Sequence, residues 1–482
     1  MKSLFALFAI SLLLSAFLVP ATRWIFFKLG KLDHPDARKM HTEAVPRSGG
    51  VAIIGAYLLS VAILELLPAG GNLVFERYTS FLVQLLPATA IIFATGFLDD
   101  WQNIKPKYKI LGQLLASGFA YWAGVRLFDV APPWAVLSFL ATAFWLVLCS
   151  NAFNLIDGTD GLAGTLAIVS SAGIIIVALS LDYYPLALVF APLLGATIPF
   201  LRANWPPAKL FLGDTGSLTV GFLIGCGGAT LARRLPDGGG LSAAMLILTL
   251  PLMEVILSTA RRLLRGQSVF EADSYHIHHQ LKRQGLNSSR VLWRLGAVTL
   301  LGTAIAIAQL RIGPWERAFL VVPFLLLLIN DITRLRYPEF VVLGEALIGG
   351  RLRVWLREQI EFRSMESDIL DATGLEQSFK VLDAYARKFR LIDLNANLNG
   401  NHFQSQFGHP TAPTYTIRID LPLHSWVNFR VPIRDSASDI PAADFASIVL
   451  RVFNTQRLSC LRRELAPSPD LSTEALVLDR SG

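Results

Sequence analysis

The chain has 482 residues, of which 53% are hydrophobic and only 16% charged, and its mean hydropathy is +0.49. This composition excludes a soluble globular protein and is typical of a protein that crosses a membrane several times. The net charge of +7 is explained by the loop bias described below, so we expect no nucleic-acid partner. The three cysteines lie far apart in the sequence, and their spacing predicts neither a disulfide framework nor a metal site.

Eleven apolar windows along the chain predict transmembrane helices, because a helix needs about 20 largely apolar residues to cross a bilayer. In chain order the windows are 4–19, 49–64, 80–98, 110–125, 131–156, 161–181, 183–201, 215–232, 240–260, 295–310 and 318–330. The expected fold class is therefore an all-α polytopic membrane protein with about eleven transmembrane helices.

The first window also has the apolar core of a cleaved signal peptide. No small-x-small cleavage site stands beside the segment FLVPATR, and residues 21–48 carry six Lys and Arg against one at Lys2. Positive charge favours the cytoplasmic side, so we expect this helix to remain and the N-terminus to lie outside. The loops on the predicted inner side then hold 18 Lys and Arg and those on the outer side hold six, which makes the topology self-consistent.

Five polar motifs follow the odd-numbered windows and therefore all fall on the predicted cytoplasmic side. They are HPDARKMHTEAVPRSGG (34–50), FLDDWQNIKPKYKILGQ (97–113), NAFNLIDGTDGLAG (151–164), PAKLFLGDTGS (207–217) and FEADSYHIHHQLKRQG (270–285). Taken singly, an aspartate pair at the end of a span is usually a solvated helix end, and glycines at helix starts commonly serve close packing. Five motifs on one side indicate instead a functional site at the inner mouth of the bundle.

The aspartates of these motifs predict a cation site. An ionised aspartate at the centre of a membrane helix costs roughly 2.5–3.5 kcal/mol, and most of this cost vanishes at a helix end beside water and cations. Several carboxylates at one mouth would repel one another, and a hard cation such as Mg²⁺, shared with substrate phosphates, removes the repulsion. This is the chemistry of phosphoryl transfer. The carboxylates are Asp99, Asp100, Asp157, Asp160 and Asp214.

Other residues of the motifs suit a substrate that carries phosphate groups. Glycines at 158, 161, 213 and 216 let backbone amides approach phosphate oxygens closely. Lys109 can supply a positive charge. The histidines suit diphosphate binding or proton transfer near neutral pH, although such a cluster is equally compatible with a plain loop surface or with adventitious metal binding. They are His276, His278 and His279.

Together these motifs resemble the polyprenyl-phosphate N-acetylhexosamine-1-phosphate transferases (glycosyltransferase family 4), the integral-membrane family that starts lipid-linked glycan synthesis. The resemblance covers about residues 1–334 and rests on RKMH…VPRSGG, DDWQNIKPKYKILGQ, NAFNLIDGTDGL, FLGDTGS and HIHH in the family's order. It implies transfer of a sugar 1-phosphate from a UDP-sugar to a lipid phosphate such as undecaprenyl phosphate, with release of UMP. It also implies Mg²⁺, or alternatively Mn²⁺, as cofactor, and the cytoplasmic (inner) membrane of a bacterium as location.

The resemblance further implies roles for single residues. Asp99 and Asp100 match the family's aspartate pair, one of which would activate the lipid phosphate as a base or as a covalent nucleophile. Asp214 would join them as a metal ligand. The remaining matches are Lys39 and His41 as substrate-binding residues, Lys109 and Gln113 in the Lys-x-x-x-Gln motif, Asn151, Asn154, Asp157 and Asp160 lining the nucleotide-sugar site, Phe211 stacking on uracil, and His276, His278 and His279 on the diphosphate.

The forms PRSGG and HIHH look like the branch that starts O-antigen, teichoic acid or exopolysaccharide chains, with N-acetylglucosamine as the expected sugar and an N-acetylated 6-deoxyhexosamine left open. The alternative branch is phospho-N-acetylmuramoyl-pentapeptide transferase. More distant alternatives are a secondary transporter, which would place charges near the bilayer midplane, and an inactive scaffold, whose signature would be a lost motif aspartate. A homodimer is left open.

Residues 335–482 lie beyond the resemblance. Residues 335–360 contain the run RLRVWLREQIEF and predict a basic amphipathic linker that could lie along the membrane surface. Residues 361–482 predict a small cytoplasmic α+β domain, with a helix and a strand in 375–394, strands TYTIRIDL and SWVNFRVPI, and a helix in 444–465. A regulatory or docking role with an unknown partner is a hypothesis for this domain.

Overall fold

The structure is a computed structural model with two compact units, Met1–Phe340 and Val341–Gly482, which are described separately. In the first unit it describes residues 2–33, 44–66, 72–130, 134–235, 237–264, 267–268, 275–335, 337 and 339–340. In the second it describes 341, 362, 364–370, 372, 374–389, 391–408, 414–422, 424–432 and 442–455. Most of the predicted linker, including 342–360, lies outside the described residues.

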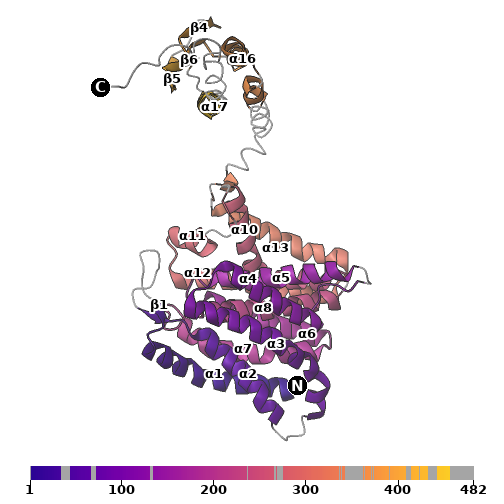
Figure 1. Cartoon of the computed structure of the whole chain (residues 1–482). Helices are drawn as coiled ribbons and strands as arrows, with labels where there is room; N and C mark the ends of the chain where they lie inside the picture. The colour runs from indigo at the N-terminus through magenta and orange to yellow at the C-terminus, as the bar shows by residue number, and fades with distance from the viewer. Residues whose placement is uncertain are drawn as a thin grey trace, which may run out of the picture. The chain divides into compact units, whose positions relative to one another are not determined.

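The first unit is a bundle of helices that lie side by side (Figure 1). The helices are α1 (Lys2–Lys28), α2 (Gly49–Leu66), α3 (Asn72–Gln102), α4 (Pro106–Trp122), α5 (Ala135–Ile156), α6 (Leu162–Ser180), α7 (Tyr184–Asn204), α8 (Gly213–Arg234), α9 (Gly239–Ile247), α10 (Thr249–Leu264), α11 (Ile277–Arg283), α12 (Ser288–Ala308) and α13 (Pro314–Arg334). Two short strands, β1 (Leu32–Asp33) and β2 (Val45–Pro46), pair in an antiparallel manner. A 3-10 turn, Gln309–Arg311, follows α12.

Eight helices of the described chain are long and apolar enough to span a membrane, or nine if the bent pair α9–α10 is one span. The two members of this pair meet at 78°. The two other predicted windows also form helices, but α4 has only 17 residues and α13 carries charges near both ends. The multi-pass membrane class is therefore confirmed, while the number of eleven spans and their orientation stay predictions.

Helix α8 lies at the centre of the bundle, and its whole apolar window is buried. Its glycines let α5 approach closely, since a Cβ at Gly221 would lie 2.7 Å from the backbone oxygen of Cys149. At Gly225 a Cβ would lie 2.8 Å from the Cys149 Cβ, and the Gly225 oxygen accepts a hydrogen bond from Trp145 Nε1 at 2.9 Å. Small residues four apart are a usual basis of close helix packing in membranes.

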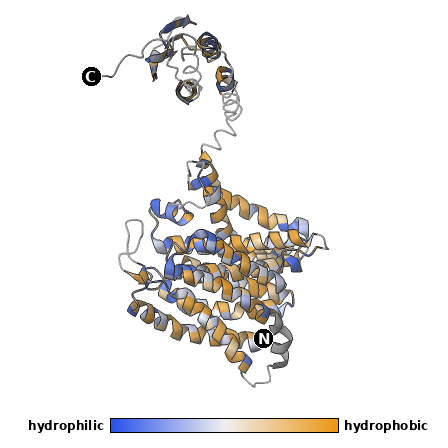
Figure 2. Ribbon diagram, in the orientation of Figure 1, coloured by the Kyte–Doolittle hydropathy of each residue, from blue (hydrophilic) through white to orange (hydrophobic). Residues whose placement is uncertain are grey.

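The outer surface of the bundle is apolar, as expected for a lipid-facing perimeter. Large side chains point outward from several helices, including Phe5 of α1, Trp122 of α4 and Phe319 of α13. Hydrophilic residues gather instead toward the end of the bundle where β1 and α11 lie (Figure 2). The described parts of the polar motifs converge at this end.

The second unit has its own hydrophobic core and a four-stranded antiparallel sheet of order β4-β3-β6-β5. Its elements are α16 (Leu375–Lys388), β3 (Asp393–Leu398), β4 (Asn401–Gln406), β5 (Thr414–Leu421), β6 (Ser425–Pro432) and α17 (Ala442–Thr455). Helices α16 and α17 and strands β5 and β6 follow predicted segments, although residues 456–465 of the predicted helix 444–465 lie outside the described residues. Strand β3 overlaps its predicted segment, which ends at residue 394, only at residues 393 and 394, and β4 was not predicted. Asn399 and Gly400 both have positive φ angles, +53° and +86°. An Asn-Gly pair of this kind is a strong hairpin signal.

Candidate active site

Four helix ends meet at the polar end of the bundle and bring together residues that are far apart in the sequence. Lys109, in the first turn of α4, lies with its Nζ 3.1 Å from Asp99 Oδ2, in the last turn of α3. The same ammonium contacts Asp214 Oδ2, in the first turn of α8, even more closely. Asn154 Nδ2, from the last turn of α5, donates to that oxygen at 3.0 Å. We call Asp99, Lys109, Asn154 and Asp214 the acidic cluster.

The acidic cluster holds two carboxylates and one ammonium, so a negative charge remains. The side chains of Lys109, Asp99 and Asp214 are only 22%, 15% and 21% exposed. Partly buried carboxylates that face each other need cations nearby, because water screens them poorly. The arrangement therefore suits further positive charge from a metal ion.

Asp100 is adjacent to Asp99 but has a different environment. Its Oδ1 accepts a hydrogen bond from the Asp214 backbone at 2.9 Å, and its Oδ2 accepts from Thr215 N at 2.8 Å and Thr215 Oγ1 at 2.5 Å. These donors belong to the first turn of α8, where backbone N–H groups have no partner within the helix. Gly213 makes this approach possible, since it has φ +72° and a Cβ there would lie 2.7 Å from Asp100 Oδ2. Asp100 thus caps α8 from another helix.

Asp157, directly after α5, faces Asp214, Asp100 and the Gly213 backbone at the start of α8. Loss of surrounding water raises its pKa well above the ordinary range, and the charges of Asp214 and Asp100 raise it further. The charge of Arg47 and a hydrogen bond from the Gly213 backbone act in the opposite direction. The surroundings of Asp157 therefore shift its equilibrium towards the protonated form.

The loop that follows is tied to the segment before α8. Asp160 Oδ2 accepts a hydrogen bond from Ala208 N at 3.0 Å, and Gly161 N donates to Asn204 Oδ1 at 2.8 Å. Asn204 Nδ2 in turn donates to the Leu210 oxygen at 2.8 Å. The sequence reading missed Asn204, which is only 3% exposed, because an asparagine at a helix end is common and gives no sign of its tertiary partners.

Gln113 and Asn151 bond to each other across α4 and α5. Asn151 Nδ2 donates to Gln113 Oε1 at 2.8 Å, and Gln113 Nε2 donates to Asn151 Oδ1 at 3.3 Å. Gln113 is fully buried. The structure thus gives these two residues a role in joining two helices beside the site, and their predicted contact with substrate stays a prediction.

Phe211 lies in an extended segment beside β2. Its backbone N donates to the Pro46 oxygen at 2.9 Å, and its oxygen accepts from Gly49 N at 2.9 Å. This pairing places PRSGG next to FLGDTGS at the start of α8. Lys39 and His41, which precede PRSGG, lie outside the described residues.

The histidine segment, residues 275–285 of the motif FEADSYHIHHQLKRQG, lies against the loop between α5 and α6. A Cβ at Gly158 would be 3.3 Å from His278 Nε2, so this nitrogen faces the loop. His278 is 1% exposed, and among the described contacts its Nε2 has no hydrogen-bond partner. Burial lowers the pKa of His278 well below its ordinary value, and the charges of His279, His276 and Lys282 lower it further. Burial is also the main cause that lowers the pKa of His279.

A buried carboxylate that the sequence reading did not select supports this segment. Glu254 of α10 lies with its Oε1 2.8 Å from His276 Nδ1, and its Oε2 accepts a hydrogen bond from Ile277 N at 2.9 Å. Only its place inside an apolar window, where an acidic residue is unusual, could have singled it out.

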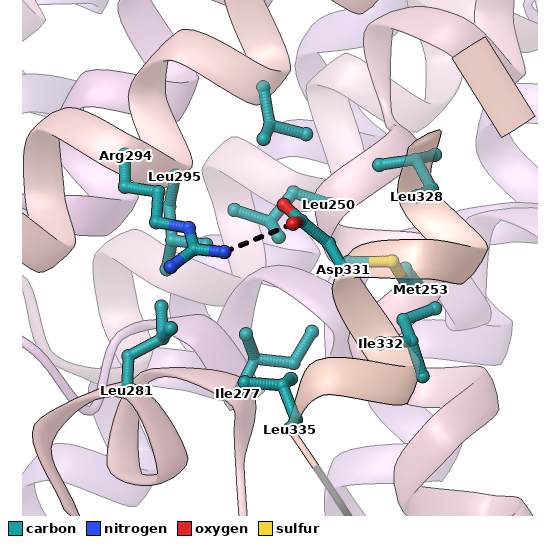
Figure 3. A pocket seen from close by; sticks show the side chains of 11 residues that line it. Leu250, Met253, Ile277, Leu281, Arg294, Leu295, Leu328, Asp331, Ile332 and Leu335 are labelled. Carbon is teal, nitrogen blue, oxygen red and sulfur yellow. Dashed lines mark hydrogen bonds and ion pairs between the residues drawn. The ribbon is translucent and has the colours of Figure 1, made fainter. Parts of the chain in front are cut away.

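A small pocket lies against the apolar face of α11, lined by Ile277 and Leu281 of that helix and by residues of α10, α12 and α13 (Figure 3). Its lining is apolar except for Arg294 and Asp331, whose side chains form an ion pair at 3.1 Å. None of the predicted site residues lines it. We therefore locate the candidate active site at the acidic cluster and the loops around it, and not in this pocket.

Within the described ranges, no three His, Cys, Asp or Glu side chains are grouped so that they could hold a metal ion by themselves. Asp99 and Asp214 provide two facing carboxylates, while the oxygens of Asp100 are taken up by α8. This donor set suits a cation such as Mg²⁺, which is commonly bound by one or two carboxylates together with substrate phosphates and water.

Comparison with known proteins gives a family assignment that agrees with the resemblance found in the sequence motifs. Residues 82–231, which run from α3 to α8, match the glycosyl transferase family 4 model. The chain is 29% identical over 335 residues to a probable undecaprenyl-phosphate N-acetylglucosaminyl 1-phosphate transferase of Bacillus subtilis, covering 67% of this chain and 89% of that protein. It is 27% identical over 366 residues to a decaprenyl-phosphate N-acetylglucosaminephosphotransferase of Mycobacterium tuberculosis, covering 62% and 88%.

An undecaprenyl-phosphate alpha-N-acetylglucosaminyl 1-phosphate transferase of Yersinia pestis is 30% identical over 304 residues, covering 59% of this chain and 79% of that protein. The matches span most of each relative. With the membrane bundle and the acidic cluster described above, they show that this chain is a multi-pass membrane protein that belongs to glycosyl transferase family 4, the family its sequence motifs resemble.

Proposed function

We propose that the protein transfers N-acetylglucosamine 1-phosphate from UDP-N-acetylglucosamine to undecaprenyl phosphate, releases UMP, and so starts a lipid-linked cell-surface glycan. The acidic cluster is the observation that carries this proposal, because charged side chains at a membrane helix end suit phosphoryl transfer. The relatives above are named for N-acetylglucosamine 1-phosphate transfer. Those names favour this reaction over the muramoyl-pentapeptide reaction, transport and an inactive scaffold.

In the proposed reaction an oxygen of the lipid phosphate forms a bond to the β-phosphorus of the donor. The bond from that phosphorus to the oxygen that bridges to the α-phosphorus breaks, and UMP leaves with this oxygen and its electron pair. We assign activation of the lipid phosphate, as a base, to Asp99, because its carboxylate faces Lys109 and Asp214 in the cluster and, unlike that of Asp100, is not held by the backbone of α8. Asp100 holds α8 and so positions Asp214.

Lys109 and Asn154 position the reacting groups. The Lys109 ammonium already contacts both carboxylates, and it can bind a phosphate oxygen as a point charge. Asn154 orients the Asp214 carboxylate by donating to it. Asp99 and Asp214 would hold Mg²⁺, with Mn²⁺ as an alternative, and the ion would supply charge neutralisation on the diphosphate.

We place the nucleotide-sugar against the 157–161 loop, the Phe211 segment and α11. His278 Nε2, which has no hydrogen-bond partner among the described residues, faces this loop. A buried polar atom of this kind is expected to bond to a ligand or to water. Asp160 is tied to the segment before Phe211. The nucleotide would reach this end of the bundle from the cytoplasm, and the lipid would reach it through the membrane.

This placement requires the site and the second unit to face the cytoplasm and the N-terminus to lie outside, in the inner membrane of a bacterium. The lipid could carry another chain length, since one relative is named for decaprenyl phosphate. The proposal is compatible with a homodimer and with a partner that binds the second unit, and it requires neither.

The proposal is tested by UMP release from the purified full chain in detergent, with undecaprenyl phosphate and a panel of UDP-N-acetylhexosamines. We expect release to require lipid and to stop when EDTA removes divalent cations. Asp99→Asn should abolish it, whereas Asp129→Asn, which breaks an exposed ion pair with Arg233, should not. Release without lipid, or equal release from both variants, would contradict the proposal.

A further inference from the structure

We infer that Glu254 of α10 is a positioning residue for the histidine segment, holding His276 and the start of α11 in place for the reaction proposed above, on which this inference rests. Glu254 is 2% exposed. Each of its two oxygens has one partner at the start of the segment, His276 Nδ1 at 2.8 Å and Ile277 N at 2.9 Å. The two contacts fix both the ring and the backbone.

Helix α11 depends on such support because it has only seven residues, too few to form a stable helix alone. Its N-cap residue is His276, whose side chain makes no capping hydrogen bond to the helix among the described contacts. Glu254 supplies that bond from another helix. On its apolar face, Ile277 and Leu281 line the pocket between α10, α12 and α13 (Figure 3).

The carboxylate also has a chemical consequence for His276. An acceptor at Nδ1 favours the ring state in which Nδ1 carries a hydrogen, and so makes Nε2 the nitrogen available to a ligand. The orientation of this ring bears on its neighbour, since the rings of His276 and His278 are stacked with centroids 5.6 Å apart and planes 12° apart. Glu254 can thereby influence the His278 Nε2 that faces Gly158.

Burying a carboxylate costs free energy unless the charge is paired and hydrogen-bonded. Glu254 lies 3.9 Å from the equally buried Arg261 of the same helix, which partly offsets its charge. Arg261 alone does not account for both oxygens, because the second oxygen is bonded to Ile277 N. The arrangement resembles the way a carboxylate orients a functional histidine in many enzymes.

Glu254→Gln tests this inference because an amide has one acceptor oxygen and cannot serve both donors. We expect kcat to fall about 10–100-fold, by analogy with the loss of a carboxylate that orients a metal-bound histidine, and the KM for UDP-N-acetylglucosamine to rise. The KM for undecaprenyl phosphate should stay within about twofold, since the segment is placed at the donor. Glu254→Asp should recover part of kcat. Glu316→Gln is the matched control, because Glu316 caps α13 by accepting from Gly313 N.

A double-mutant cycle separates positioning from a purely structural role. If Glu254 acts through His276, Glu254→Gln should cause no further loss of kcat in a His276→Ala background. Losses that multiply in the double variant would overturn the inference. The cycle is repeated with Glu254→Asp if the glutamine variant does not fold.

Hydrogen exchange provides a readout that does not depend on activity. Peptides that cover residues 275–285 should exchange faster in Glu254→Gln than in the unchanged chain, and not in Glu316→Gln. If the unchanged chain released no UMP, the proposed reaction would be wrong. Hydrogen exchange would still test whether Glu254 holds the histidine segment in place. Equal exchange in both variants would contradict the anchoring role.

Discussion

Asp99 and Asp100 are neighbours in the chain, yet their carboxylates do different things. Asp99 pairs with Lys109, whereas Asp100 accepts three hydrogen bonds from the first turn of α8. The two aspartates could not be told apart from the sequence, because nothing in a run of two aspartates shows which one contacts the end of another helix. The separation of their roles can be tested directly.

Asp100→Asn should lower stability, and Asp99→Asn should lower activity. An asparagine at position 100 places an amide group opposite a backbone donor of α8, which should reduce the free energy of unfolding by about 1–3 kcal/mol. At position 99 the same change removes one of two facing like charges, so the stability should stay equal or rise. Thermal unfolding in detergent and UMP release by both variants would check this. The same loss of stability in both would contradict the distinction.

Much of the candidate site could be predicted at this scale. The sequence indicated that Asp99, Lys109, Asn154 and Asp214 share a site, because apolar windows place their motifs at the same end of the bundle. It could not show that Gln113 bonds to Asn151 or that Glu254 supports the histidines. Such contacts depend on how helices rotate and pack, which a hydropathy pattern does not determine.

At the scale of elements, α11 is the part of the site most dependent on its surroundings. His278 has a pKa lowered mainly by burial, so its ring is neutral in the folded protein at neutral pH. In an opened segment the ring takes up a proton near its ordinary pKa of about 6.5. The histidine therefore destabilises the folded segment as the pH falls below that value towards its lower folded pKa.

We expect the hydrogen-exchange protection of residues 275–285, corrected for intrinsic exchange, to fall between pH 7.5 and 5.5. His278→Asn should weaken this dependence, because it removes the buried titrating ring. The segment 299–308 of α12, which contains no histidine, is the internal control. Protection that rises at the lower pH, or a dependence unchanged in the variant, would contradict the assignment.

Helix α8 gives a second test at this scale. Gly221→Ala places a Cβ 2.7 Å from the Cys149 backbone oxygen, and such overpacking should cost about 1–3 kcal/mol of stability. Gly118→Ala in α4 is the matched substitution, since a Cβ there meets nothing within 4 Å. It should be neutral or stabilising by up to about 1 kcal/mol. Thermal unfolding of the two variants compares them, and equal midpoints would argue against the tight contact of α5 and α8.

Element boundaries show where sequence reasoning ends. Each of the eleven apolar windows predicted from hydropathy overlaps a helix. Hydropathy did not show the break in residues 240–260, where α9 and α10 meet at 78°. Pro251, in the first turn of α10, is a physical reason for the break, because it has no N–H for a bond to the preceding turn. Strand β4 was missed because its residues, NHFQSQ, lack the apolar alternation of β5 and β6.

At the scale of the whole molecule, the chain combines a membrane unit with a second unit that has its own core. Deletion of residues 341–482 should therefore leave the membrane unit folded, with an unchanged thermal midpoint and with UMP release at saturating substrate. A regulatory or docking role predicts that the deletion changes abundance, partner binding or activity at low substrate. If none of these changes, that role is wrong.

The central claim is that the sugar moves together with its phosphate. The most direct test uses UDP-N-acetylglucosamine labelled at the β-phosphorus, incubated with undecaprenyl phosphate and the purified chain. The account predicts that the label appears in the lipid product and that the released nucleotide is unlabelled UMP. Label that remains on the nucleotide, as UDP, would show transfer of the sugar without its phosphate and would contradict the account.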